Sequence, residues 1–178
     1  MNSKTFTGTC GDNLTWTLDK NGTLSISGTG DMYDYDINLR KYPEWYTHEY
    51  SHEQMHVINI IIKDGITSIG NGAFESNAEL TGIDIPNTVT KIGNHAFSLC
   101  TGLTQIMLPD SLVSIGDYAL SSTGINSVTI PYSVTHIGDC VFSDLKLVAI
   151  YVSTKSINYR VVDGVNTIFL PLQTSKTI

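Results

Sequence analysis

Two overlapping copies of the sequence His-Glu-x-x-His occupy residues 48–56. The first runs from His48 to His52 and the second from His52 to His56. On a helix this spacing places two imidazoles on one face, where they can bind Zn²⁺, and the glutamate between them can act as a general base. The chemistry available to these residues is metal-assisted hydrolysis, so a zinc-dependent hydrolase is one hypothesis for the chain.

The element that must position these histidines is a short helix predicted over residues 43–56. On such a helix His48 and His56 lie about 12 Å apart, so a single ion can use only two of the three histidines. No later segment offers a convincing third ligand. Because the histidines share a helix face with Trp45 and Met55, we expect this helix to pack against the segment that follows. Packing is then the preferred role of the histidines, with an adventitious or structural metal and a catalytic zinc as the alternatives.

Other catalytic patterns are missing from the sequence. There is no Gly-x-Ser-x-Gly elbow, no phosphate-binding loop and no calcium loop. Cys10, Cys100 and Cys140 do not have the spacing of a metal site or a disulfide framework. We expect three separate thiols, although one disulfide bridge stays open as an alternative. The prediction is a protein that is not an enzyme and carries no cofactor.

Composition narrows the classes of partner. The 178 residues suffice for one domain or one repeat array, and 41% are hydrophobic whereas 15% are charged. This balance favours β-structure with many turns. The formal net charge is -7, and no cluster of Lys or Arg offsets it, so we expect no nucleic-acid partner. No apolar run is long enough to cross a bilayer, so we expect no membrane insertion.

An internal repeat of about 23 residues dominates the sequence. Ile-Gly pairs begin at Ile69, Ile92, Ile115 and Ile137, with spacings of 23, 23 and 22 residues. Alignment on these pairs produces seven columns of apolar residues. In the second repeat these columns contain Leu80, Ile83, Ile85, Val89, Ile92, Ala96 and Phe97. Because one repeat cannot close a core alone, stacked repeats must bury each column, at about 1.5–3 kcal/mol per large side chain.

Local signals within each repeat predict its elements. The alternation at Ile83-Asp84-Ile85 predicts a short strand, and Pro86 ends it because proline has no N–H for the ladder. After each Ile-Gly pair comes Asn or Asp, which is favoured at helix N-caps, and Ala-Phe then begins a short helical turn. The predicted fold is an α/β repeat solenoid of short strands and short helical turns.

The repeat Leu-x-x-Ile-x-Ile-Pro-x-x-Val-x-x-Ile-Gly-x-x-Ala-Phe resembles the BspA-like class of leucine-rich repeats. The resemblance covers residues 55–152 and extends to 11–28, which look like the β-rich cap of such arrays. It departs from the family pattern where Leu120 replaces Phe and Val141 replaces Ala. The resemblance implies a surface or secreted protein, typical of bacteria and some protists, that adheres to host or microbial partners.

The chain is expected to divide into four segments. Residues 1–42 form a β-rich N-terminal cap with a β-hairpin at 14–27, and 43–56 form the helix leading into the array. Residues 57–152 are the leucine-rich repeats, and 153–178 form a C-terminal hairpin and tail. The first residues lack the apolar core of a signal peptide, so the protein is either cytoplasmic or has already lost its signal.

One surface of the predicted array is the candidate binding site. Side chains alternate along a strand, so residues beside the buried columns point outward. We call this surface the strand face; it comprises Asp84, Gln105, Met107, Ser127, Thr129 and Tyr151. The preferred function is non-catalytic recognition of a protein or glycan on the strand face, at the cell surface or after secretion. A structural spacer within a larger surface protein is the alternative beside the zinc hydrolase.

Overall fold

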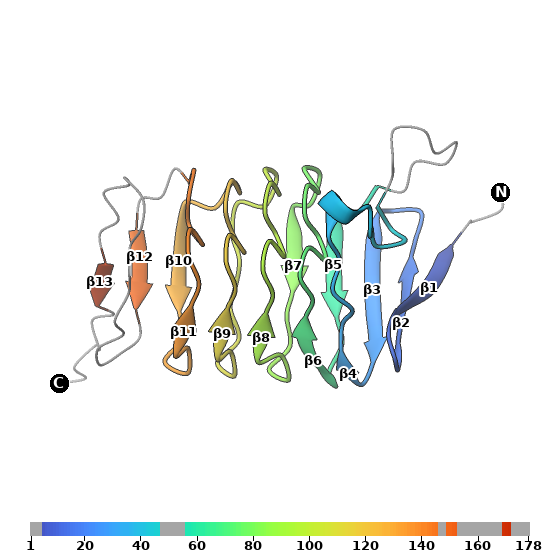
Figure 1. The fold of residues 1–178 in the computed structure, drawn as a ribbon, viewed down its shortest axis with the longest axis horizontal. Coiled ribbons are helices and arrows are strands. Elements are labelled where there is room, and N and C mark those ends of the chain that lie inside the picture. Colours follow the sequence, from blue (N-terminus) through green and yellow to red (C-terminus); the bar gives the residue numbers. More distant parts are fainter. Residues whose placement is uncertain (1–4, 47–55, 146–148, 153–168, 172–178) are drawn as a thin grey trace.

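The computed structural model describes residues 5–46, 56–145, 149–152 and 169–171. In this part of the chain the coils of a solenoid lie side by side along the long axis, from β1 (Phe6–Gly11) to β13 (Phe169–Pro171) (Figure 1). We number the coils from the first full repeat, so that they begin at Val57, Leu80, Leu103 and Ile125.

The first side of the solenoid carries the N-terminal strands and the strands that open the repeats. Across the five-stranded sheet they are β1, β2 (Leu14–Leu18), β3 (Thr23–Gly28), β5 (Asn59–Ile62) and β7 (Gly82–Asp84). β2 and β3 form the antiparallel hairpin predicted at 14–27, and β3, β5 and β7 pair in parallel. β10 (Ser127–Ile130), β12 (Ala149–Val152) and β13 continue this side as a parallel three-stranded sheet. Residues 104–108, between β7 and β10, form no strand.

The second side is a parallel sheet built from the Ile-Gly segments. Its strands are β11 (His136–Ile137), β9 (Ser114–Ile115), β8 (Lys91–Ile92), β6 (Ile66–Ile69) and β4 (Gly30–Asp31). The isoleucines before each glycine pair in register, Ile69 with Ile92, Ile92 with Ile115 and Ile115 with Ile137. The repeat spacing therefore sets the register of the ladder.

The third side, formed by the Ala-Phe segments, contradicts the prediction of short helical turns. In the described residues the one helix is η1 (Ile37–Leu39), a 3-10 helix outside the repeats. In the second coil His95 and Leu99 have φ of 56° and 63°, the left-handed region, two residues on either side of Phe97. The Phe74 N–H donates to Ala96 O at 2.9 Å, and the Phe97 N–H donates to Ala119 O at 2.9 Å. Alternate backbone N–H groups of this segment thus bond to the next coil, where a helix would use partners within one coil.

The Asn and Asp residues after each Ile-Gly pair were predicted as helix N-caps, and this prediction is also wrong. The Asn71 Oδ1 accepts the backbone N–H of Asn94 at 2.7 Å, and the Asn94 Oδ1 accepts that of Asp117 at 2.9 Å. These side chains thus form a ladder between coils. A Cβ at Gly93 would lie 2.6 Å from Asn71 N, so the close approach that makes the ladder requires glycine before each Asn or Asp.

The apolar columns fill the interior between the three sides. Leu80, Leu103 and Ile125 are buried at equivalent places in successive coils. In the phenylalanine column the Phe74 and Phe97 rings stack with centroids 5.4 Å apart. Leu120 continues that column as a buried residue, and Phe142 lies partly buried at its end. The core is therefore continuous along the solenoid.

Trp45 closes the N-terminal end of the phenylalanine column. Its ring stacks on Phe74 with centroids 5.8 Å apart, and its indole N–H donates to Ala73 O at 3.1 Å. It therefore provides both an aromatic ring and a donor, as a further coil would. The helix predicted over 43–56 is a turn in its described part, where the Tyr46 N–H donates to Pro43 O at 2.9 Å. Residues 47–55 lie outside the described residues.

Only a short part of the predicted C-terminal hairpin, β13, lies within the described residues, so the hairpin stays a prediction. β13 pairs in parallel with β12, with Ile150 opposite Phe169. It therefore extends the parallel ladder of that sheet. Residues 153–168 and 172–178, which hold the rest of the predicted hairpin and tail, lie outside the described part.

Truncation of a phenylalanine in this column should destabilise the fold more when its ring is more deeply buried. Phe97→Ala should lower the free energy of unfolding by about 3–5 kcal/mol, because it removes a fully buried ring from the stack. Phe142→Ala, at the partly buried end of the same column, should cost clearly less. Urea unfolding followed by circular dichroism measures both values. Equal losses would contradict a core that depends on neighbouring coils.

Candidate functional site

Of the three histidines singled out by the sequence, His56 alone lies within the described residues. Its side chain is exposed, and its Nδ1 lies 2.6 Å from Glu79 Oε2 in the turn of the first coil. His48 and His52 lie outside the described part. Within the described residues no three His, Cys, Asp or Glu side chains come together in a group that could hold a metal ion. The interaction observed for His56 is thus a contact with a carboxylate.

Cys10 and Cys100 are free thiols, as expected from the spacing of the cysteines. Burial is the main cause that raises the pKa of Cys10 and of Cys100 to about 12 in each case. The Cys100 Sγ donates to Phe74 O at 3.0 Å. Since the thiolate is the reactive form, neither buried thiol is activated for nucleophilic chemistry at neutral pH.

Five of the six side chains of the strand face are exposed. Asp84 ends β7, Gln105 and Met107 lie in the segment 104–108, and Ser127 and Thr129 are the exposed positions of β10. Tyr151 lies in β12 with its backbone opposite Thr129, but its side chain is outside the described part. Met107 is 85% exposed, the most exposed large hydrophobic side chain in the described chain. The structure thus presents one apolar side chain amid hydroxyl and amide groups, which supports non-covalent contact.

A pocket that sequence reasoning missed lies at the junction of the N-terminal segment with the first two coils. Its volume is about 380 Å³, and it is lined by residues of the segment 34–41 together with Asn71, Gly72, Glu75, Asn94 and His95. We call it the His95 pocket. The sequence could have indicated part of this pocket, because one outward position of each repeat holds, in turn, Gly72, His95, Tyr118 and Cys140. Nothing in the sequence indicated that segment 34–41 would lie beside this row.

The His95 ring forms one wall of this pocket. It stacks on the Tyr118 ring of the third coil, with centroids 5.0 Å apart and planes inclined by 7°. Its Nδ1 lies 4.0 Å from Glu75 Oε1. The Glu75 side chain is only 12% exposed. Burial raises the pKa of Glu75, and the nearby Asp36 carboxylate adds to the increase, whereas His95 lowers it.

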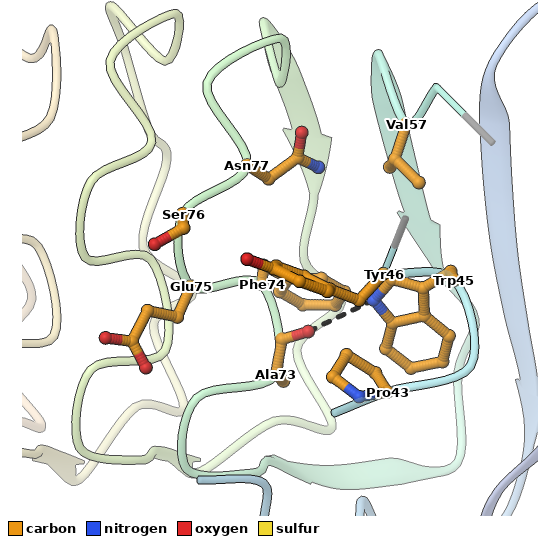
Figure 2. A pocket seen from close by; sticks show the side chains of 9 residues that line it. All are labelled: Pro43, Trp45, Tyr46, Val57, Ala73, Phe74, Glu75, Ser76 and Asn77. Carbon is orange, nitrogen blue, oxygen red and sulfur yellow. Dashed lines mark hydrogen bonds between the residues drawn. The ribbon is translucent and has the colours of Figure 1, made fainter. Parts of the chain in front are cut away.

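A second, smaller cavity lies on the other side of Glu75, between Trp45 and the first coil (Figure 2). Its volume is about 110 Å³, and Pro43, Tyr46, Val57 and Phe74 contribute apolar walls. Figure 2 shows the Glu75 carboxylate directed away from the aromatic rings of this cavity. The charged end of Glu75 therefore belongs to the His95 pocket.

A search of the described residues for a long, apolar helix able to cross a membrane finds none.

Comparisons with known proteins agree with the geometry. The model of the BspA type leucine rich repeat region matches residues 46–166 in six copies. A leucine-rich repeat protein from Eubacterium ventriosum is 27% identical, with a TM-score of 0.72 over 88% of this chain and 41% of its own. A leucine-rich repeat protein from Bacteroides ovatus is 25% identical, with a TM-score of 0.50 over 79% of this chain and 46% of its own.

A third leucine-rich repeat protein, from Bacteroides capillosus, is 23% identical and shares the fold, with a TM-score of 0.52 over 80% of this chain and 95% of its own. The match to the E. ventriosum protein covers 41% of that protein, so the chain spans about two fifths of its length. None of the curated proteins compared with the chain matches it.

Replacement of Glu75 should have a pH-dependent effect on stability. Because the pKa of Glu75 is raised in the folded chain, its contribution to stability is present at low pH and is lost as pH rises through the folded pKa. Glu75→Gln should therefore raise the free energy of unfolding relative to the wild type at neutral pH, and the difference should shrink below the ordinary pKa of 4.5. Urea titrations at several pH values measure this, and a pH-independent difference would contradict it. Asp84→Asn, at an exposed position, is the control.

The hydrolase hypothesis can be tested directly on the metal content. Protein prepared without a polyhistidine tag should contain far less than one equivalent of zinc and should not hydrolyse a casein substrate, because no third ligand is evident. Mass spectrometry of the metal and a peptidase assay measure the two quantities. Stoichiometric zinc that is lost in His52→Ala, together with hydrolysis, would overturn this expectation.

Proposed function

Because the chain belongs to the BspA-type leucine-rich repeat family, we propose that it is a non-catalytic recognition module, secreted or held at a cell surface. It binds a protein or a glycan through the strand face. The family match covers most of the chain, whereas the function rests on the chemistry of this surface. The resemblance to surface repeat proteins supports the proposed location.

The exposure of Met107 is the observation that carries this proposal. The interior columns of the solenoid already bury the apolar side chains that the fold needs, and Met107 is 85% exposed outside them. Its flexible thioether adapts to the shape of a partner, and burial on binding removes its apolar surface from water. Solvent-exposed apolar groups within a polar surround are typical of contact surfaces.

The remaining side chains of the strand face suit neutral hydrogen bonding. Gln105, Ser127 and Thr129 are exposed and uncharged, and Asp84 is the one charged member of the set. A partner would therefore be held by neutral polar contacts around an apolar anchor. Because few charges take part, we expect binding that depends weakly on salt.

The solenoid supports this role by fixing the backbone beneath the side chains. Ser127 and Thr129 lie in β10, which pairs along its length with β12. Their inward neighbours, Val128 and Ile130, are buried in the core. A face held in this way loses little conformational entropy when a partner binds.

The experiment is a substitution at the proposed anchor. Met107→Lys should weaken binding to the partner at least tenfold, because it replaces an apolar contact with a charge that must lose water. The labelled chain is first applied to arrays of immobilised extracellular proteins and glycans, and the affinity of each ligand found is then measured for the variant.

Tyr132→Lys provides a matched control. Tyr132 is 70% exposed in the turn that follows β10, so the variant adds the same charge at an exposed apolar position outside the strand face. It should bind as the wild type does, and circular dichroism should show both variants folded. A Met107→Lys protein with unchanged affinity would show that this surface is not the binding site.

A further inference from the structure

The His95 pocket lies apart from the strand face and has a different chemistry. We propose that it binds a hexose unit of a glycan, either neutral or carrying an amino group. This inference goes beyond the proposed function, because it assigns a second site, separate from the strand face, and names the kind of sugar unit that it takes. With a volume of about 380 Å³, the pocket falls within the range typical of small-molecule sites.

The first argument is the free face of the His95 ring. On the side of the third coil the ring is covered by Tyr118 in parallel stacking at 5.0 Å. On the side of the first coil the equivalent residue is Gly72, which has no side chain to continue the stack. The pocket lies on this side, where Gly72 and His95 both line it. A sugar ring can occupy the place of the missing ring, since its C–H groups pack against the electron-rich face of an aromatic ring.

The second argument is the supply of hydrogen-bond acceptors. The Asp34 Oδ1 accepts the Asn71 N–H at 2.8 Å, and the Asp36 Oδ1 accepts the Asn38 N–H at 2.9 Å. The other oxygen of each carboxylate can accept a further bond. Glu75 is 12% exposed, and its Oε1 lies 4.0 Å from His95 Nδ1, beyond the length of a hydrogen bond. A ligand hydroxyl would satisfy this desolvated group.

The third argument is that donors stand beside these acceptors. The Oδ1 atoms of Asn71 and Asn94 are used in the ladder between coils, so their amide N–H₂ groups remain as donors. The Lys41 ammonium lines the same pocket. A sugar hydroxyl both donates and accepts, and thus matches a mixed lining. A guanidinium group only donates, so it would leave the amides and Lys41 without a partner.

Charge restricts the sugar further. Asp34, Asp36 and Glu75 contribute three carboxylates to the pocket, against the single ammonium of Lys41 and the imidazole of His95. A uronic or sialic acid would bring a further negative charge into this surround and would be disfavoured. A neutral hexose avoids this repulsion, and an amino sugar gains attraction from Glu75.

The test uses free sugars of one ring type that differ in charge. Glucose, galactose and mannose probe the neutral class, and glucosamine and glucuronic acid introduce a positive and a negative charge. Saturation-transfer NMR detects binding of each sugar at millimolar concentrations, and titration measures the affinities. We expect at least one neutral hexose or glucosamine to bind, and we expect glucuronic acid to bind at least tenfold more weakly than glucosamine.

The variants distinguish the pocket from the rest of the surface. His95→Asn removes the ring but keeps a residue type that accepts the φ of 56° found there, and it should weaken sugar binding at least fivefold. Cys140→Asn is the matched control, since position 140 has φ of 55° in a later coil and does not line the pocket. Glu75→Gln should reduce the preference for glucosamine over glucuronic acid. Met107→Lys should leave sugar binding unchanged. The proposals for the strand face and for the His95 pocket can therefore fail independently of each other.

Three outcomes would overturn the proposal. The first is that none of the five sugars binds to the folded wild-type protein. The second is sugar binding that is equal in His95→Asn and in Cys140→Asn, which would place the sugar elsewhere. The third is that an arginine-rich peptide binds, is lost in Glu75→Gln, and is not displaced by any sugar, which would identify a site for cationic side chains.

Discussion

Each inner coil of the described array depends on hydrogen bonds to the coils on either side of it. On the second side of the solenoid the later coil donates to the earlier one, as when the Gly93 N–H bonds to Ile69 O at 2.9 Å. On the third side the direction reverses, and the Phe74 N–H bonds to Ala96 O at 2.9 Å. A terminal coil therefore exposes carbonyl groups on the third side at the N-terminal end. The Tyr35 N–H, at 2.7 Å from Asn71 O, and the Trp45 indole close that end.

This constraint explains which features of the fold were predictable. The repeat spacing and the seven apolar columns follow from the sequence, because residues that must stack have to recur at one interval. The helical turns and the N-caps were predicted from local rules. Both predictions failed because alternate backbone N–H groups, and the side chains of the Asn and Asp residues, bond to the next coil. At His95, Leu99 and Tyr118 the left-handed backbone costs about 1–2 kcal/mol per residue, and no residue preference reveals it. Hydrogen bonds between coils offset that cost.

The two candidate surfaces also differ in how far the sequence predicts them. The outward positions of the strand face could be identified from alternation, because Val128 and Ile130 face the core and leave Ser127 and Thr129 outside. The His95 pocket could not, because its lining comes from the N-terminal segment and two coils. The His-Glu-x-x-His motif stays untested as a metal site, because His48 and His52 lie outside the described residues. For its one described histidine, the observed partner is Glu79 of the first coil.

The location of the pocket follows from where the repeat ceases to be regular. Within the array an outward ring is covered by the ring of the next coil, as Tyr118 covers His95. Gly72 interrupts this row at the first coil, and a Cβ there would lie 2.9 Å from Tyr35 O. The N-terminal segment thus approaches so closely that it excludes a side chain at position 72 and leaves the opposite face of His95 free. The same contact that caps the solenoid also prevents the stack from being completed, so the end of the array is the place where a ligand ring fits.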